Sequence, residues 1–248
     1  MSNSLRVGAC QTPEIIGDIG AALACVEGFA RRAGSRADIL LFPECFLQGY
    51  MVTPKHVSRN AISLDSEQFR SILGRLSSIP PTVVFGLIEQ AGESFFNTAV
   101  VIQRGKLLGK YRKTHLLDGE KIFIPGAEYP VFTQHGVTFG INICYDAQFP
   151  EAAQAVAEQG AQLLLLPAQN MLRLESAKKW KDLHNEVRAK RVKETGMWLV
   201  SADVTGKRGN THIGYGPTCA LNSQAQVVAQ VPLLQTGMII ASVTTTEP

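Results

Sequence analysis

The stretch Gly140-Ile141-Asn142-Ile143-Cys144-Tyr145-Asp146 places a cysteine and an acid at the end of an apolar run. The run from Thr138 to Cys144 is short, apolar and contains β-branched residues, which predicts a buried strand. Phe149-Pro150-Glu151 follows closely and is expected to open a helix at Phe149–Glu158. A strand that leads into a helix is typical of α/β folds, in which ligands bind beyond the carboxyl ends of strands. Cys144 is therefore well placed to react.

Short apolar runs on both sides of this segment predict further strands. We expect them at Leu5–Cys10, Ile39–Phe42, Thr82–Ile88, Ala99–Ile102, Leu163–Leu166, Trp198–Ala202, Pro217–Leu221, Ala225–Val231 and Met238–Val243. Gln103–Lys106 lies between two apolar segments and is expected to form a hairpin turn.

Amphipathic stretches alternate with the strands in the first and third quarters of the chain. Helices are expected at about Gly20–Ala33, Ser66–Leu76 and Ser176–Thr195. The last of these begins at a candidate N-cap, Ser176, and its apolar stripe consists of Trp180, Leu183, Val187 and Val192. The sequence contains neither a linker-like stretch nor an internal repeat. We therefore expect residues 1–248 to form one α/β domain whose sheets are covered by helices.

Composition excludes several classes of protein. The chain has 248 residues, of which 45% are hydrophobic and 18% charged. A chain of this length buries about 70–75% of its unfolded surface, so it needs neither disulfides nor a metal to fold. The longest purely aliphatic run, Leu163–Leu166, is far too short to span a bilayer, so no membrane partner is expected. Met1–Val7 carries no apolar leader, so we expect no export.

Charge and cysteine content narrow the choice further. The net charge of +3 is too small to indicate a nucleic-acid partner, and the basic run Lys178–Lys193 has the spacing of a solvated helix face. The five cysteines are an odd number without a CxxC pair. That pattern predicts free thiols, a cytoplasmic location and no metal site. We expect no cofactor.

Three apolar segments end at chemically reactive side chains. Ile39–Phe42 is followed by Pro43 and Glu44, and the basic cluster around Lys113 leaves a hairpin strand. The third is the run that ends at Cys144. A free cysteine is only about a few per cent thiolate at neutral pH, so it needs a base, a nearby cation and an oxyanion donor to act as a nucleophile. A glutamate, a lysine and a cysteine supply these roles without a metal.

Simpler interpretations exist for each residue taken alone. A buried cysteine is usually inert, and single lysines and glutamates usually lie on the surface. His115 lies two residues after Lys113, so a Cys144–His115 dyad is an alternative. We expect His115 to be a supporting or packing residue instead. The remaining histidines lack metal-ligand spacing.

Taken together, three segments resemble the nitrilase superfamily of carbon–nitrogen hydrolases. They are Leu40-Leu41-Phe42-Pro43-Glu44, Tyr111-Arg112-Lys113-Thr114-His115-Leu116 and Gly140–Asp146 with Phe149-Pro150-Glu151. Glu44 and Lys113 are 69 residues apart and Lys113 and Cys144 are 31 apart, which also fits this family. Asn97-Thr98-Ala99 is a smaller echo of the same pattern.

The resemblance implies a four-layer α-β-β-α sandwich that pairs into a homodimer. It also implies that Glu44 is the general base, Lys113 the catalytic lysine and Cys144 the nucleophile. Glu120 matches a second glutamate that the family often has. The backbone N–H of Tyr145 would complete an oxyanion site with Lys113.

The substrate-binding segments match less closely. The expected lining of the pocket consists of Tyr145, Phe149, Gln169 and Asn170. The cysteine segment is similar to the omega-amidase-like branch, but Ala147-Gln148 replaces an arginine-containing pair that is common there. This difference argues against a dicarboxylic amide as substrate.

The sequence therefore predicts hydrolysis of a small aliphatic amide to a carboxylic acid and ammonia through a cysteine thioester. One alternative is an N-carbamoyl amine hydrolase, which would release carbon dioxide and ammonia. The other is a catalytically silent scaffold that binds metabolites or proteins. Because Glu44, Lys113 and Cys144 are all present, the enzyme is favoured, with a small amide or carbamoyl compound as its partner.

Overall fold

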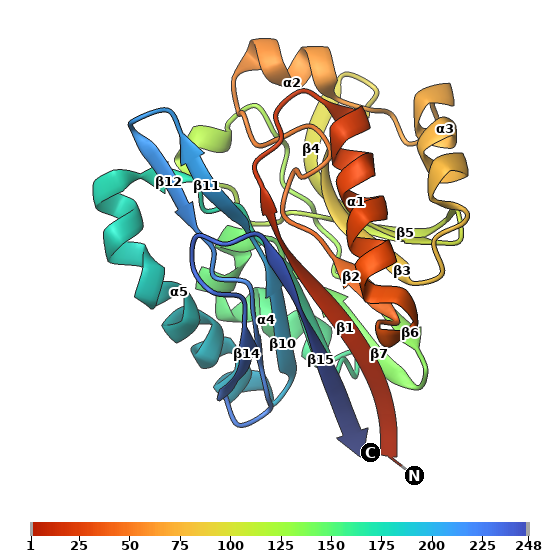
Figure 1. The fold of residues 1–248 in the computed structure, drawn as a ribbon, viewed down its shortest axis with the longest axis vertical. Coiled ribbons are helices and arrows are strands. Elements are labelled where there is room, and N and C mark those ends of the chain that lie inside the picture. The colour runs from red at the N-terminus through yellow and green to blue at the C-terminus, as the bar shows by residue number, and fades with distance from the viewer. Residues whose placement is uncertain (1, 247–248) are drawn as a thin grey trace.

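The computed structural model describes residues 2–246, which form two β-sheets and their covering helices (Figure 1). The larger sheet has nine strands in the order β5-β4-β3-β2-β1-β11-β12-β9, and β15 pairs with β1 as well. Its strands are β1 (Ser2–Pro13), β2 (Ile39–Leu41), β3 (Thr82–Ala91), β4 (Ser94–Gln103), β5 (Lys106–Arg112), β9 (Leu172–Arg173), β11 (Val204–Arg208), β12 (His212–Tyr215) and β15 (Gly237–Thr246).

The smaller sheet has six strands in the order β14-β13-β10-β8-β7-β6. They are β6 (Val131–Gln134), β7 (Val137–Ile141), β8 (Leu163–Pro167), β10 (Trp198–Ala202), β13 (Cys219–Leu221) and β14 (Val227–Gln230). The helices are α1 (Ile19–Ala33), α2 (Pro54–Asn60), α3 (Glu67–Leu76), α4 (Pro150–Ala157) and α5 (Leu174–Thr195). Among the described helices, none is long and apolar enough to cross a membrane.

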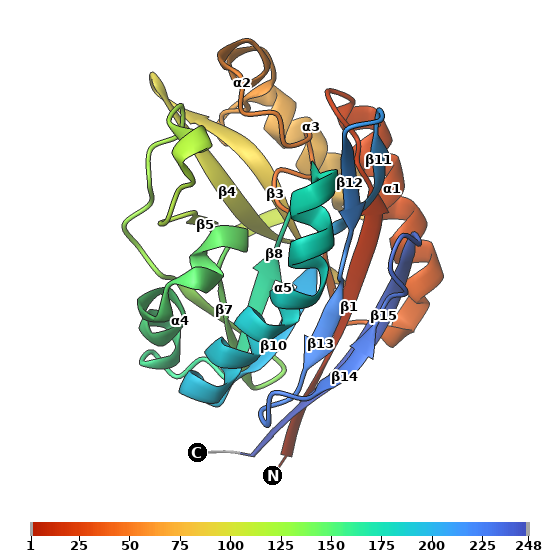
Figure 2. The same cartoon turned by 90° about the vertical axis from the view of Figure 1, so that its left-hand side faces the viewer.

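The elements stack as an α-β-β-α sandwich (Figures 1 and 2). Helices α1 and α3 pack on the outer face of the larger sheet, where Phe29 and Phe69 are buried with Phe85 of β3. Helices α4 and α5 cover the smaller sheet through Val156 and Val192. The third apolar cluster lies between the two sheets. The expected four-layer architecture is thus confirmed.

Strands with two buried faces explain the sandwich. In β8, Leu163 and Leu165 point into the space between the sheets, whereas Leu164 and Leu166 point toward the helices. Successive side chains of a strand point to opposite faces, so a continuous leucine run satisfies both layers at once. The leucine run Leu163–Leu166 is therefore part of a central strand, between β7 and β10.

Several boundaries differ from the sequence expectations. Helix α5 begins at Leu174, two residues before Ser176, and its N-cap residue Arg173 makes no side-chain capping bond. Ser176 as the N-cap is therefore wrong, because the chain is already helical there. The apolar run after Thr138 leaves the strand at Ile141, since Cys144 opens a 3-10 turn.

The short helix α2 and the strands β6, β9, β11 and β12 were not expected from the sequence. Helix α2 is capped by Thr53 and starts with Pro54, but it buries only Val57 and so carries no apolar stripe. The hairpin turn at Gln103–Lys106 is confirmed between β4 and β5. Its central residues Arg104 and Gly105 both have positive φ, as a two-residue hairpin turn requires.

Candidate active site

The strand directions bring the expected site residues to one end of the sandwich. Strands β2 and β3 are parallel, and β5 runs the same way because β3, β4 and β5 are successively antiparallel. Glu44 follows β2 and Lys113 follows β5, so both lie at the same edge of the larger sheet. In the smaller sheet, Cys144 and Asn170 come after the parallel strands β7 and β8. A backbone bond from Glu44 N to Ala168 O, 3.3 Å long, joins the two edges.

Cys144 stands at the start of a strained turn. The turn Cys144–Gln148 follows β7, and Cys144 has a φ of 44°, in the left-handed region that non-glycine residues seldom occupy. The Asp146 carboxylate holds the turn by accepting hydrogen bonds from Ile143 N at 2.8 Å and Tyr111 Oη at 2.8 Å. It also accepts a bond from His115 N at 2.8 Å. Strained backbone of this kind is concentrated at functional sites.

Glu44 is buried directly beneath β3. Its Oε1 accepts hydrogen bonds from Asn97 Nδ2 and Lys113 Nζ, both at 2.7 Å. Gly86 on β3 permits this approach, because a Cβ there would lie 2.6 Å from Glu44 Cα. Only glycine fits at that position, so the packing of β3 fixes where the carboxylate points.

Lys113 and Glu120 complete a buried charge cluster with Glu44. The Lys113 ammonium lies 3.0 Å from each oxygen of Glu120 and 2.7 Å from Glu44 Oε1. Its side chain is fully buried. Glu120 is held in turn by Leu117 N at 2.8 Å and Asn97 Nδ2 at 3.2 Å. Two carboxylates therefore fix a single cation in place.

Burial and charge set the protonation of this cluster. Burial raises the pKa of Glu44 to about 7, although the neighbouring Lys113 partly offsets it. Burial pulls the pKa of Lys113 down, but Glu44 and Glu120 outweigh it, so the pKa of the ammonium is raised and it stays charged. Near neutral pH, Glu44 is therefore able both to accept and to donate a proton.

The thiol of Cys144 is protonated at rest. Burial raises its pKa, and the charge of Glu44 raises it further. Lys113 and the backbone N–H of Gln169 act in the opposite direction. The thiol therefore needs a base to remove its proton before it is able to attack. Glu44 is the candidate base, because its carboxylate is close enough for its charge to raise the pKa of the thiol.

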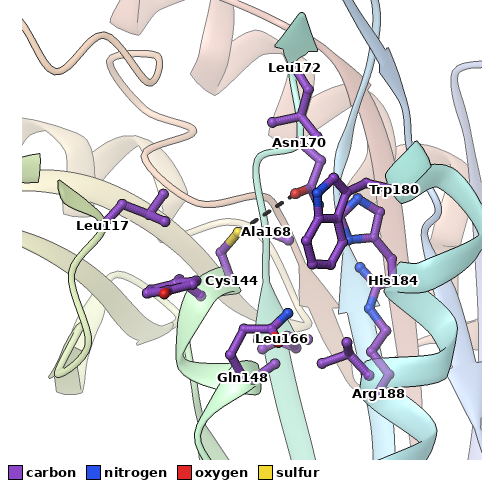
Figure 3. A pocket seen from close by; sticks show the side chains of 13 residues that line it. Leu117, Cys144, Gln148, Leu166, Ala168, Asn170, Leu172, Trp180, His184 and Arg188 are labelled. Atoms are coloured by element: carbon purple, nitrogen blue, oxygen red, sulfur yellow. Dashed lines mark hydrogen bonds between the residues drawn. The ribbon is translucent and has the colours of Figure 1, made fainter. Parts of the chain in front are cut away.

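A cavity of about 190 Å³ opens above Cys144. Tyr145 and Asn170 line it, as the sequence predicted, and the Cys144 Sγ lies 3.8 Å from Asn170 Oδ1 (Figure 3). The other lining residues are Leu117, Ala147, Gln148, Leu166, Ala168, Leu172, Trp180, His184, Val187 and Arg188. Cys144 is half-buried at the cavity wall, whereas the charge cluster is sealed off from solvent.

Two of the expected pocket residues lie elsewhere. Phe149 stacks on His115 with 3.9 Å between ring centroids and is absent from the lining of the cavity. The Gln169 side chain donates to Glu14 Oε1 at 2.6 Å, and its link to Cys144 is through the backbone. His115 is bonded to Asp146, which leaves no Cys144–His115 dyad among the described contacts.

Residues that the sequence interpretation missed anchor both sides of the site. Asn97 donates to both buried glutamates, and Asn97-Thr98-Ala99 was a usable signal for it. Asp203 accepts bonds from Asn170 N at 2.9 Å and Asn170 Nδ2 at 2.5 Å. Burial raises the pKa of Asp203 to about 6. It follows strand β10, so its place at the carboxyl edge of the sheet was a further signal.

The described part of the chain has no evident metal-binding site. Within residues 2–246, no group of three or more His, Cys, Asp or Glu side chains is arranged to hold a metal ion. What the site offers instead is a thiol, a buried carboxylate and a fixed ammonium beside one cavity. That set suits nucleophilic attack on a carbonyl carbon.

Comparison with known proteins gives a consistent family match. The family model described as carbon–nitrogen hydrolase matches residues 6–247. An (R)-stereoselective amidase from a Pseudomonas species is 32% identical over 135 residues, which are 54% of this chain and 49% of the relative. An omega-amidase from Homo sapiens is 27% identical over 215 residues, 82% of this chain and 75% of the relative.

Solved structures match over more of the chain. The crystal structure of an amidase from Nesterenkonia sp. has a TM-score of 0.83 and 25% identity, covering 97% of this chain and 90% of the other. A variant of that amidase carries the acetamide moiety of fluoroacetamide covalently on its active-site cysteine. By contrast, matches to several curated relatives span only about half to three fifths of their length: 49% for the Pseudomonas amidase and 61% for a hydrolase from Pseudomonas protegens.

Proposed function

The chain belongs to the carbon–nitrogen hydrolase family, in the nitrilase superfamily, and from that premise we propose that it hydrolyses small amides through a thioester on Cys144. One observation carries the proposal. A fully buried ammonium, Lys113, is held between Glu44 and Glu120, and its charge acts on the thiol that lines the cavity. An ion pair that only stabilises the fold would need one carboxylate and no thiol beside it, so the second carboxylate and the nearby Cys144 support a catalytic role.

The first half of the reaction forms the acyl-enzyme. Glu44 removes the thiol proton, and the Cys144 sulfur attacks the amide carbon to form a C–S bond. The carbonyl π electrons move to oxygen, where the Lys113 ammonium and the Tyr145 N–H stabilise the negative charge. When the tetrahedral intermediate collapses, the C–N bond breaks and Glu44 returns its proton to the leaving ammonia.

The second half releases the acid. Glu44, ionised again, takes a proton from water, whose oxygen attacks the thioester carbon. The C–S bond then breaks and the Cys144 thiol regains its proton from Glu44. A carboxyl group with a pKa of about 7 suits both halves, since it alternates between base and acid near neutral pH. Glu120 does no proton transfer in this scheme and fixes the Lys113 cation.

Replacing the nucleophile tests this proposal. Cys144→Ala is expected to lower kcat for a short amide by at least ~10⁴-fold, as removal of a nucleophile from a coupled set does. The matched control is Cys10→Ala, which removes a buried thiol from the opposite, α1-covered face of the larger sheet. In wild-type protein, substrate should protect Cys144, and not the other four cysteines, from iodoacetamide. Activity of Cys144→Ala within tenfold of wild type would exclude the covalent mechanism.

We also propose that residues 1–248 act as one hydrolase domain, which the family match over residues 6–247 supports, and that this domain pairs into a homodimer in the cytoplasm. All five cysteines are unpaired, which supports a reducing compartment. Val227 and Val228 of β14 are exposed at the edge of the smaller sheet, which supports a subunit contact. Sedimentation velocity at micromolar concentration should give a dimer, and a monomer would remove that part of the proposal.

A further inference from the structure

Helix α5 forms one wall of the cavity above Cys144. Figure 3 shows Trp180 and His184 of this helix beside the sulfur, with Leu117 on the other side. The rings of Trp180 and His184 are in contact, with their centroids 5.5 Å apart and their planes tilted by 30°. The lining next to the thiol is therefore mainly aromatic and aliphatic. Its polar side-chain atoms near the thiol belong to Gln148, Asn170 and His184.

Among the residues 2–246 that line the cavity, the one permanent positive charge is already paired within the protein. Arg188 is the lining residue with a permanent cation, but its Nη1 donates to Pro217 O at 2.7 Å and to Asn185 Oδ1 at 3.1 Å. Its Nη2 lies 3.8 Å from Asp203 Oδ2. Its Nη1 is thus used within the protein, its charge is paired with Asp203, and only 2% of the residue is exposed.

His184 does not supply a charge either. Burial, reinforced by the neighbouring Arg188, lowers the pKa of His184 to about 3, so its ring is neutral at working pH. A substrate carboxylate entering here would lose its water without gaining a cationic partner, which is strongly unfavourable.

We propose that Trp180 and His184 select the acyl group of the substrate, and that the cavity accepts uncharged, apolar acyl groups up to about the size of a benzene ring. This inference rests on the proposed amide hydrolysis. A dry cavity of about 150 Å³ in another protein holds benzene, so the 190 Å³ found here has room for such a group. Amides whose acyl chain ends in a carboxylate are disfavoured.

The wild-type enzyme provides a test that needs no variant. Hexanamide and adipamate, the monoamide of adipic acid, have the same chain length and differ in the terminal carboxylate. We expect kcat/KM for hexanamide to exceed that for adipamate by at least ~10²-fold, because the carboxylate is left without a partner. Equal or better hydrolysis of adipamate would overturn the inference.

Two variants test which residues are responsible. Trp180→Ala removes the aromatic wall and should shift the preferred acyl chain from hexanamide toward decanamide. Trp198→Phe, outside the cavity, should leave the preference unchanged.

Leu172→Lys places a cation in the lining and should raise the ratio of kcat/KM for adipamate to kcat/KM for hexanamide at least ~10-fold. Its matched control is Leu174→Lys, which alters an exposed residue outside the lining.

The possible results separate the two proposals. An unchanged chain-length preference in folded Trp180→Ala, checked by circular dichroism, would overturn the assignment of Trp180. An unchanged ratio in folded Leu172→Lys would overturn the electrostatic explanation. If none of the amides were hydrolysed and Cys144 were unreactive toward iodoacetamide, the proposed function itself would fail. Hydrolysis with the wrong acyl preference would reject only the substrate class.

Discussion

The buried Glu44 carboxyl should make this protein less stable as the pH rises from about 4.5 to about 7. Its side chain is 1% exposed, and burial raises its pKa from 4.5 to about 7. A group whose pKa is raised on folding holds its proton more tightly in the folded state than in the unfolded one. A pKa that rises from 4.5 to about 7, at about 1.4 kcal/mol for each tenfold change in proton affinity, corresponds to about 3 kcal/mol of unfolding free energy.

The sign follows from which state binds the proton. Below about pH 4.5 the carboxyl is protonated in both states, and its stabilising contribution is fully present. Between about pH 4.5 and pH 7 the unfolded state ionises first, so stability falls by about 3 kcal/mol. Glu44→Gln removes this titration but keeps an oxygen acceptor for Lys113 and Asn97. The variant should therefore gain about 3 kcal/mol relative to wild type over this range, although it loses its base.

Urea unfolding followed by far-ultraviolet circular dichroism measures the difference at each pH. The matched control is Glu89→Gln, which alters a carboxylate that is equally buried at 2% exposure. Burial raises the pKa of Glu89, but its bonds with Arg112 and Lys110 outweigh it and lower the pKa overall. Its contribution is thus present above pH 4.5 and is lost as the pH falls below that value, so the difference between Glu89→Gln and wild type should stay flat from about pH 4.5 to 8.

A flat difference between wild type and Glu44→Gln from about pH 4.5 to 8 would refute the reasoning. It would mean that Glu44 titrates in the folded protein as it does in the unfolded chain. The Glu44 carboxylate would then be a much weaker base toward the Cys144 thiol than a group with a pKa of about 7.

Two further substitutions test the rest of the site. Lys113→Met keeps the stem and deletes the charge, so kcat should fall at least ~10²-fold, the scale of one lost oxyanion donor; an unchanged kcat with a raised KM would make Lys113 a binding residue. Asp203→Asn removes the charged acceptor that holds Asn170 and should lower kcat/KM about tenfold, in line with one charge-assisted hydrogen bond. A matching loss of melting temperature with the catalytic constants intact would make Asp203 a purely structural residue.

Local sequence was sufficient to predict the reactive side chains that come directly after a strand. Glu44, Lys113 and Cys144 each come within a few residues of a strand end, and parallel strand directions carry them to one edge. The helical stripe of α5 was harder to interpret. Val192 packs into the core, but Trp180 lies only half-buried against the cavity. Periodicity identifies an apolar face but not what it covers, because that depends on tertiary packing.

The polar residues that support the site were less predictable. Local sequence signals the positions of Asn97 and Asp203 but not their partners, because their side chains bond to groups 53 and 33 residues away in the sequence. Phe149 was expected in the pocket because it is close to Cys144 in sequence. The 3-10 turn Cys144–Gln148 separates Phe149 from Cys144, and the Phe149 ring stacks on His115 instead.

The central claim is that substrate becomes covalently attached to Cys144, and intact-protein mass spectrometry tests it most directly. Wild-type protein would be mixed with hexanamide, quenched in acid within the first turnovers, weighed and digested to locate the modification. The account predicts a mass increase equal to one hexanoyl group less one hydrogen, confined to Cys144 and lost in Cys144→Ala. Ammonia release by wild-type protein without any adduct, or an adduct on another cysteine, would contradict it.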